Sequence, residues 1–156
     1  MDQKTNVMRM LDSAKLAYTA YTYPATTAWS GAEVARFIGQ DPDHVFKTLV
    51  TVGFSKKNYV FVIPVAQELS LKKAASAVGE KSIAMLKSKE LLPLTGYVHG
   101  GCSPIGMKKL LPTVVDETAL LYDTLIFSAG RIGYQVELSP NALLQLVPYT
   151  MAELTV

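Results

Sequence analysis

Cysteine and histidine are scarce in this sequence of 156 residues, which contains one cysteine, Cys102, and two histidines. A single cysteine excludes an internal disulfide and is typical of a protein kept in a reducing compartment, so we expect a cytoplasmic location. His44, expected on the surface, and His99 are far apart in the chain and form no recognisable set of metal ligands with one cysteine. The sequence therefore predicts neither a metal centre nor a cofactor.

Long apolar runs are also missing. No run reaches the roughly 18 residues that a membrane-spanning helix needs, and Met1 to Lys4 open a mixed polar stretch without the apolar centre of a signal peptide. We therefore expect no membrane contact. Hydrophobic residues make up 49% of the chain and charged residues 18%, which excludes a disordered chain and leaves enough apolar side chains for a core. This length predicts one domain over residues 1–156.

The net charge of +2 is small and does not by itself indicate nucleic-acid binding. Lysines nevertheless gather in several places: Lys56, Lys57, Lys72, Lys73, Lys81, Lys87, Lys89, Lys108 and Lys109. They form either a phosphate-facing surface or a solvated one, and the sequence leaves both readings open.

Short strands mixed with short helices, without a repeat or a linker, predict an α+β fold. Periodic apolar positions predict a helix over 5–16, and capping residues before such positions predict helices over 30–39, 71–78, 88–92 and from 139 onward. In the fourth of these, Ser88 is the expected cap and Pro93 the expected end. β-Branched and aromatic residues predict strands over 18–23, 47–54, 59–65, 82–86, 113–116, 124–128 and 134–138. The almost wholly apolar segment 59–65 is expected to be a central strand covered on both faces.

The segment Gly100 to Gly106 reads Gly-Gly-Cys-Ser-Pro-Ile-Gly and concentrates residues with special backbone properties. Glycine permits positive φ and a close approach to a ligand, while proline fixes φ. Adjacent glycines leave their N–H groups uncovered, which suits an anion or a developing oxyanion. From composition alone, the alternative is a tight structural turn between two strands.

Two of the loop's side chains invite a nucleophile interpretation, which the sequence does not favour. Cys102 has no evident activating partner and is expected to be a small inert hydrophobe. Ser103 is followed by proline and lacks the context of a nucleophile elbow, so its hydroxyl is expected to orient the loop or the substrate.

Polar and small residues also mark two strand ends. Lys47 opens an otherwise apolar and β-branched strand. It either extends its ammonium into water or holds a carbonyl or phosphate as a point charge. Ser128, Ala129 and Gly130 end another apolar strand, where they either line a tight pocket or form a β-turn.

The glycine segment resembles the Gly-Gly-x-Ser-Pro-x-Gly loop of the YbaK/EbsC family. That family comprises aminoacyl-tRNA deacylases that act in trans and are related to the inserted editing domain of bacterial prolyl-tRNA synthetases. Two further stretches, Val45 to Val50 and Ser128 to Gly133, are similar to family motifs in order and spacing. The resemblance extends from about Thr5 to Val147, and three motifs in order are more specific than any one of them.

The resemblance implies a strongly curved, barrel-like mixed β-sheet surrounded by short helices. It also implies hydrolysis of the ester of mischarged aminoacyl-tRNA, with Cys-tRNA(Pro) as the leading substrate. In the implied chemistry the substrate's own thiol attacks the ester carbonyl, and the protein supplies positioning and electrostatics. Aminoacyl-tRNA is the implied partner, and prolyl-tRNA synthetase is a further candidate partner.

The same resemblance assigns roles to individual residues. Lys47 is expected to hold the terminal adenosine or the carbonyl, and Gly100 and Gly101 to offer backbone contacts to the reacting centre; these three are the expected catalytic residues. The expected substrate-binding residues come from the pocket and the loops around it: Tyr23, Thr48, Ser103, Pro104, Ser128, Ala129, Gly130 and Gln135.

The third motif departs from the pattern of typical Cys-tRNA deacylases. Ala129 replaces a glycine, Ile132 replaces an arginine, and Gln135 stands where an aspartate is expected. In the shorter loop after Tyr23, either Trp29 or Ser30 replaces an aromatic residue. These departures leave the amino-acid specificity open.

Three alternatives to Cys-tRNA(Pro) deacylation therefore stand. One is a deacylase for another small amino acid, as in Ala-tRNA(Pro). Another is a non-catalytic module of the same fold that binds aminoacyl-tRNA or a synthetase. The third is an unrelated small-molecule binding protein.

Overall fold

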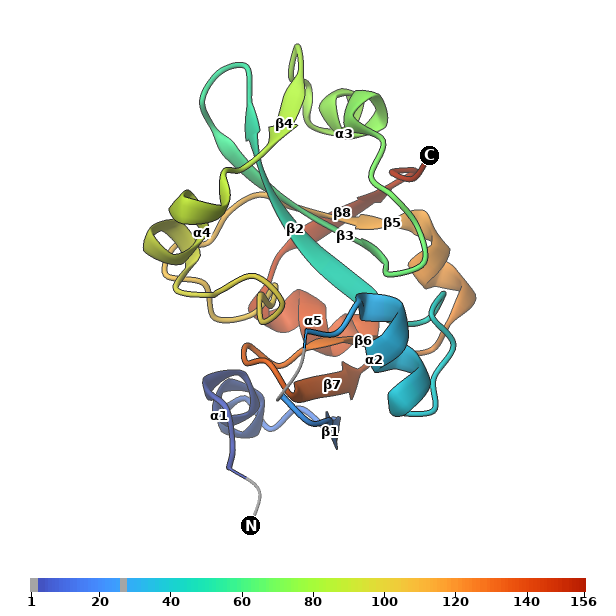
Figure 1. The fold of residues 1–156 in the computed structure, drawn as a ribbon. Helices are drawn as coiled ribbons and strands as arrows, with labels where there is room; N and C mark the ends of the chain where they lie inside the picture. Colours follow the sequence, from blue (N-terminus) through green and yellow to red (C-terminus); the bar gives the residue numbers. More distant parts are fainter. Residues whose placement is uncertain (1–2, 26–27) are drawn as a thin grey trace.

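The computed structural model describes residues 3–25 and 28–156 (Figure 1). Met1 and Asp2, and residues 26–27 of the predicted loop, lie outside the described residues. In chain order the elements are α1 Asn6–Ser13, β1 Thr19–Thr22, α2 Gly31–Phe37, β2 Phe46–Gly53, β3 Asn58–Pro64, α3 Leu71–Val78, β4 Ile83–Met85, α4 Ser88–Thr95, β5 Thr113–Asp116, the 3₁₀ helix η1 Glu117–Leu121, β6 Leu125–Ser128, β7 Tyr134–Leu138, α5 Pro140–Leu146 and β8 Tyr149–Ala152. The predicted α+β class is confirmed.

The strands form two hydrogen-bonded sheets. One has three strands in the order β1-β7-β6, and the other has five in the order β4-β2-β3-β5-β8. The larger sheet is mixed, because β3 pairs with β5 and β5 with β8 in parallel while its other pairs are antiparallel. A parallel bridge between Val45 and Ile126 brings the start of β2 to β6. A mixed sheet is therefore present, but two bridged sheets stand where one barrel-like sheet was expected.

The apolar strand β3 lies at the centre of the larger sheet, between β2 and β5, and six of its seven residues are buried. Val60 and Val62 pack into the main hydrophobic core, whereas Tyr59, Phe61 and Ile63 pack into a second core on the other face. Successive side chains of a strand point to opposite faces, so a strand covered on both sides is apolar throughout. The prediction of a central strand is confirmed.

Side-chain caps begin most of the helices as the sequence predicts. Ser30 accepts a hydrogen bond from the backbone N–H of Glu33 at 3.1 Å, and the Glu33 carboxylate accepts one from the backbone N–H of Ser30 at 2.8 Å. This capping box fixes the start of α2 beside β2. Ser70 and Ser139 cap α3 and α5 in the same way, each through its hydroxyl.

The prediction for α4 is wrong at both ends. Lys87 is the N-cap, without a side-chain hydrogen bond, and Ser88 is already helical. Pro93 lies inside the helix, which continues to Thr95 and ends at Gly96 with φ 86°. The left-handed Gly96 closes the last turn, and the Thr95 hydroxyl donates to the carbonyl of Leu91 at 2.8 Å.

Several predicted orientations also differ. The helical spacing of apolar residues predicts Phe37 of α2 and Leu144 of α5 on the inward faces of their helices, but these side chains are 52% and 46% exposed. His44 was expected on the surface but is half-buried, because its ring stacks on Tyr122 and its Nε2 lies 2.8 Å from the carbonyl oxygen of Thr124. Both contacts are made with residues about 80 positions away, which local sequence patterns do not report.

Strand β8 and η1 were not predicted. β8 is short and only partly buried, and it is a strand because it pairs with β5 in parallel. In the described part of the chain, no helix is long and apolar enough to cross a membrane.

Candidate functional site

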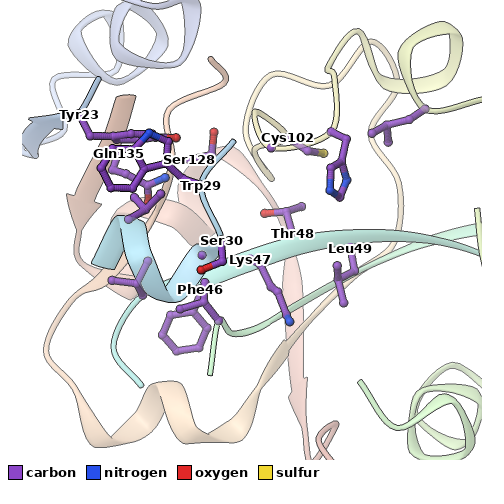
Figure 2. A pocket seen from close by; sticks show the side chains of 17 residues that line it. Tyr23, Trp29, Ser30, Phe46, Lys47, Thr48, Leu49, Cys102, Ser128 and Gln135 are labelled. Carbon is purple, nitrogen blue, oxygen red and sulfur yellow. The ribbon is translucent and has the colours of Figure 1, made fainter. Parts of the chain in front are cut away.

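A cavity of about 380 Å³ lies beside the first half of β2, between the two sheets (Figure 2). Its walls come from β2, α2, α4, the glycine loop and the facing ends of β6 and β7. The lining residues are Tyr23, Trp29, Ser30, Gly31, Val34, Val45, Phe46, Lys47, Thr48, Leu49, Val65, Leu91, His99, Gly100, Cys102, Ser128 and Gln135. Six of the residues predicted for the site are among them: Tyr23, Lys47, Thr48, Gly100, Ser128 and Gln135.

The cavity follows a part of β2 that is paired on one side. β3 pairs with β2 along its length, but β4 pairs with β2 over Thr51 to Gly53. In the described structure no strand of the larger sheet covers the other edge at Lys47 and Thr48. Figure 2 shows the Thr48 side chain on one face of β2 and the Lys47 and Leu49 side chains on the other. Because all three line the cavity, a ligand in it can contact both faces of this strand.

Lys47 is half-buried at this edge, and burial lowers the pKa of its ammonium because desolvation disfavours the charged form. The charge of Glu68 opposes this shift but does not cancel it. Within the described residues, Lys47 belongs to neither of the two ion pairs. A partly desolvated cation without an internal ion-pair partner is suited to hold a carbonyl oxygen or a phosphate.

Two buried side-chain oxygens in the described structure have no hydrogen-bond partner, Thr48 Oγ1 and Gln135 Oε1, and both residues line this cavity. Gln135 is only 7% exposed. A buried polar atom left unpaired costs about 1–3 kcal/mol, so native proteins retain few of them. Two such atoms in one cavity mark it as a site for a polar ligand.

Aromatic side chains close one end of the cavity. Tyr23 and Trp29 meet edge to face with ring centroids 5.8 Å apart, and Trp29 meets Phe37 in the same way at 5.3 Å. The indole N–H of Trp29 donates to the carbonyl of Pro24 at 2.6 Å, which fixes the ring. Both candidates for the replaced aromatic position, Trp29 and Ser30, line the cavity.

The two leading glycines of the loop differ in their environment. Gly100 lines the cavity and has φ 87°, which glycine adopts readily. Gly101 is buried away from it, and its N–H donates to the carbonyl of Val98 at 3.0 Å. A Cβ at Gly101 would lie 3.2 Å from the backbone nitrogen of Ile132. Gly101 therefore allows the loop to pack against the β6–β7 turn, and its N–H is already engaged within the loop.

Four other predicted residues lie behind the cavity wall. Ser103, Pro104 and Ala129 are buried, and the Ser103 hydroxyl accepts a hydrogen bond from the N–H of Ile105 at 3.3 Å. Gly130, with φ 90°, donates its N–H to the hydroxyl of Ser128 at 3.1 Å. These residues shape the loop and the turn, whereas Ser128 itself lines the cavity.

Tyr97, which sequence reasoning missed, ties the glycine loop to the β6–β7 turn. Its hydroxyl donates to the carbonyl of Ile105, and burial raises the pKa of this phenol to about 12. A Cβ at Gly130 would lie 2.9 Å from the Tyr97 ring, and one at Gly106 would lie 2.7 Å from its hydroxyl oxygen. The sequence feature that could have pointed to Tyr97 is its position, as an aromatic residue just before a glycine-rich segment.

Cys102, within the glycine loop, lines the cavity, but burial raises the pKa of its thiol to about 12. The group is therefore a thiol and not a thiolate near neutral pH, which agrees with the expectation of an inert cysteine. Across residues 3–25 and 28–156, no three His, Cys, Asp or Glu side chains are grouped so that they could share a metal ion.

Comparisons with known proteins agree with one another. Residues 24–146 match the family model described as the aminoacyl-tRNA editing domain. A protein of Enterococcus faecalis, provisionally named as the Cys-tRNA(Pro)/Cys-tRNA(Cys) deacylase EbsC, is 48% identical over 154 residues, or 98% of this chain and 94% of that protein. A proline–tRNA ligase of Shouchella clausii is 27% identical over 118 residues, or 75% of this chain and 20% of the ligase. A crystal structure provisionally described as a trans-editing enzyme for prolyl tRNA synthetase is similar with a TM-score of 0.83 and 26% identity, over 99% of both chains.

Proposed function

The chain belongs to the aminoacyl-tRNA editing domain family, and from that membership we propose that it clears mischarged tRNA in trans, with Cys-tRNA(Pro) as the leading substrate. The resemblance to the YbaK/EbsC family, stated from three motifs, is confirmed by the family match and by the 48% identical relative. As a member, the chain is an aminoacyl-tRNA deacylase, a hydrolase that acts on the aminoacyl ester.

The observation that carries this proposal is the content of the cavity at the edge of β2. It combines the partly desolvated ammonium of Lys47, the positive-φ backbone of Gly100 and two unpaired polar side chains, between walls that are otherwise largely apolar. An aminoacyl ester offers matching features, since it has a carbonyl oxygen, an amino group and a small side chain. Electrostatic groups fixed in advance around a reacting carbonyl are the usual source of catalysis in such sites.

The side chains near the glycine loop argue against a protein nucleophile. The Cys102 thiol is held in its neutral form by burial. Ser103 is buried and lies outside the cavity, and the hydroxyl of Ser128 accepts a hydrogen bond from the Gly130 N–H, with no base bonded to it among the described residues. This leaves the substrate's own thiol or a water molecule as the attacking group, as the family resemblance implies.

In the proposed reaction the thiol of the cysteinyl group attacks the carbonyl carbon of its own ester. A carbon–sulfur bond forms, the ester carbon–oxygen bond breaks, and the thiol proton ends on the ribose oxygen of the released tRNA. Water then opens the cyclic thioester and gives free cysteine. The protein contributes by holding the reacting atoms together, which alone can lower a barrier by several kcal/mol.

The residues around the cavity take complementary roles in this proposal. Lys47 holds the terminal adenosine or the ester carbonyl, and Gly100 lets the loop approach the reacting centre. Tyr23 and Ser128 bound the pocket for the amino-acid side chain. A pocket of this kind separates small side chains only weakly by binding, so the cleared amino acid depends on chemistry as well as on size.

The partner in this proposal is aminoacyl-tRNA, and prolyl-tRNA synthetase is the candidate that would present it. Similarity to one fifth of a proline–tRNA ligase supports this link, since a segment similar to this chain occurs there within the ligase polypeptide. Pull-down of purified prolyl-tRNA synthetase with this protein, with and without tRNA(Pro), tests the association directly.

The decisive experiment measures release of the amino acid from a panel of charged tRNAs by the purified protein. The panel contains Cys-tRNA(Pro), Ala-tRNA(Pro), Pro-tRNA(Pro) and Cys-tRNA(Cys). Fast hydrolysis of Cys-tRNA(Pro) with slow hydrolysis of Pro-tRNA(Pro) is the expected result. Preference for Ala-tRNA(Pro) would reassign the substrate, whereas tight binding without hydrolysis of any member would identify a non-catalytic binding module.

A further inference from the structure

Thr48 Oγ1 and Gln135 Oε1 are left without partners in a structure that otherwise satisfies the buried side-chain polar atoms of its described residues. Thr51, three residues along the same strand, shows the usual outcome, since its buried hydroxyl donates to the carbonyl of Tyr59 at 3.0 Å. Gln135 comes from β7 and Thr48 from β2, so two separate sheets each bring one unpaired oxygen to the same cavity.

We propose that Thr48 and Gln135 form a two-point clamp on the α-amino ester of the substrate. Thr48 donates its hydroxyl hydrogen to the carbonyl oxygen of the ester, and Gln135 accepts a hydrogen bond from the α-amino nitrogen. This inference rests on the proposed deacylase function and assigns the two positions that recognise the reacting end of the substrate.

The assignment of each end follows from donor and acceptor chemistry. The oxygen of a glutamine amide is an acceptor, so Gln135 Oε1 needs a donor, and the amino group is the donor that every aminoacyl ester carries. A threonine hydroxyl can donate, and the ester carbonyl can only accept. The opposite assignment would place two acceptors against each other at Gln135.

Gln135 is a neutral acceptor in a cavity whose lining residues include no carboxylate. The titratable groups that line it are Lys47 on β2, His99 just before the glycine loop, Cys102 within it, and Tyr23 before α2. An amide therefore accepts from the amino group without introducing a negative charge that would attract the Lys47 ammonium. The charge of Lys47 stays available for the carbonyl or the phosphate of the substrate.

Thr48 is positioned to act when charge develops. Its side chain lies on the face of β2 that the glycine loop covers, whereas Lys47 extends from the opposite face (Figure 2). A hydroxyl fixed on a strand can donate to the carbonyl oxygen as it gains negative charge, and such a bond strengthens in the transition state. Thr48 therefore affects kcat, whereas Gln135, which holds the unreacting amino group, affects KM.

The first test uses Thr48→Val and Gln135→Leu, which nearly preserve shape and remove the unpaired atoms. Because neither atom has a partner in the free protein, the melting temperature should equal or exceed that of the wild type. We expect kcat of Thr48→Val to fall about 10²-fold with little change in KM. For Gln135→Leu, we expect KM to rise about tenfold, as loss of a hydrogen bond to a charged amine implies.

Two conservative variants and one matched control accompany them. Thr48→Ser keeps a hydroxyl and should recover most of kcat. Gln135→Glu keeps an acceptor oxygen and should recover KM, but its negative charge attracts the Lys47 ammonium and should lower kcat. Thr51→Val is the control on the same strand, where the removed hydroxyl is bonded to Tyr59. It should lower the melting temperature and leave kcat and KM unchanged, which is the reverse of Thr48→Val.

A substrate without the amino group isolates the role of Gln135. tRNA(Pro) is acylated chemically with the desamino counterpart of the amino acid that the wild type clears best, 3-mercaptopropionate for cysteine or propionate for alanine. If Gln135 holds the amine, wild type and Gln135→Leu should hydrolyse this ester with equal kcat/KM, while they differ about tenfold on the aminoacyl ester.

The outcomes separate this inference from the proposed function. A wild-type protein that hydrolyses no charged tRNA would contradict both the clamp and the proposed function. If the wild type is active and kcat/KM of Thr48→Val and Gln135→Leu lies within twofold of the wild-type value, the clamp is wrong and the deacylase function stands. A melting temperature that falls together with activity, without recovery by Thr48→Ser or Gln135→Glu, would show that both residues serve the fold and would overturn the clamp as well.

Discussion

The side chains of Lys47 and Thr48 leave β2 on opposite faces and still line one cavity (Figure 2). This is possible because β4 pairs with β2 farther along the strand and leaves the edge at these residues open to the cavity. A substrate lying across that edge can contact the ammonium on one face and the hydroxyl on the other. The two neighbours can therefore be tested as separate groups.

Lys47→Met should abolish most deacylation without destabilising the fold. Methionine keeps much of the aliphatic stem and removes the charge, so we expect kcat/KM to fall by about 10²-fold or more. Lys57→Met, at an exposed lysine of the turn between β2 and β3, is the control and should leave activity on a short acceptor-stem substrate near that of the wild type. Deacylation by Lys47→Met at the wild-type rate would exclude a catalytic role for this lysine.

The pH dependence of stability gives an independent check on Lys47. Burial lowers the pKa of the Lys47 ammonium in the folded protein below its ordinary value of 10.5, so folding disfavours the charged form. The penalty is fully present below the folded pKa and is relieved as pH rises toward 10.5. Melting temperatures measured between pH 7 and pH 10 should therefore rise for the wild type relative to Lys47→Met. A difference that is constant with pH would show that the ammonium is not desolvated.

Gly100→Ala and Gly101→Ala should differ in what they damage. Gly100 lines the cavity with φ 87°, so alanine there costs about 1–2 kcal/mol of strain and also adds a methyl group beside the substrate. At Gly101 the methyl group meets the backbone of Ile132 at 3.2 Å, which lowers stability and shifts the loop. We expect kcat/KM to fall in both variants. Relative to the drop in melting temperature, the loss of kcat/KM should be larger in Gly100→Ala than in Gly101→Ala.

Gly79→Ala is the matched control for strain. Gly79 ends α3 with φ 71°, and a Cβ there would have no atom within 4 Å, so the substitution adds strain without a steric contact. Its melting temperature should fall by an amount similar to that of Gly100→Ala, with kcat/KM unchanged. If Gly79→Ala and Gly100→Ala lose activity to the same extent, the glycine loop is a structural turn only.

Cys102→Ser should retain most of the activity. The thiol is neutral because burial raises its pKa to about 12, and it has no assigned part in the reaction. At pH 8, alkylation of the native protein by iodoacetamide should be slower than that of a free thiol by on the order of 10³-fold, and unfolding should restore the rate. Fast alkylation of the folded protein would show that the thiol is reactive. A loss of activity in Cys102→Ser by two orders of magnitude would show that Cys102 takes part in the reaction.

Affinity for tRNA should fall with salt, and two lysine pairs allow the responsible surface to be located. Lys87 and Lys89 stand at the start of α4, within about one turn of Leu91 in the cavity wall. Lys56 and Lys57 lie at the tip of the β2–β3 hairpin, which follows Gly53, and Gly53 is roughly 17 Å along the strand from Thr48 at 3.3 Å per residue. Replacing the first pair by alanine should weaken binding and reduce the salt slope by about 1–2. An equal effect from the second pair would place the tRNA along the hairpin, and no salt dependence at all would leave the lysines as solvating groups.

The sequence by itself determined the α+β class, most of the strands and helix caps, and the family. Caps such as Ser30 with Glu33 are local, because both partners lie within one helical turn, and an apolar strand such as β3 reports its own burial on both faces. The three motifs identified the family because the order and spacing of residues can be recognised in the sequence without knowledge of the fold. The assignment of residues 1–156 to one domain stays a prediction.

Only the tertiary structure decided how the predicted site residues divide between the cavity and its supports. Gly100 and Gly101 are adjacent in the sequence, yet one lines the cavity and the other packs against Ile132, which is contributed by another turn. Likewise, Thr48 and Gln135 are 87 residues apart in the chain, and both side-chain oxygens are unpaired because no polar group of the described fold approaches either of them. Hydrogen-bond partners and cavity walls are set by long-range packing, which a linear pattern does not specify.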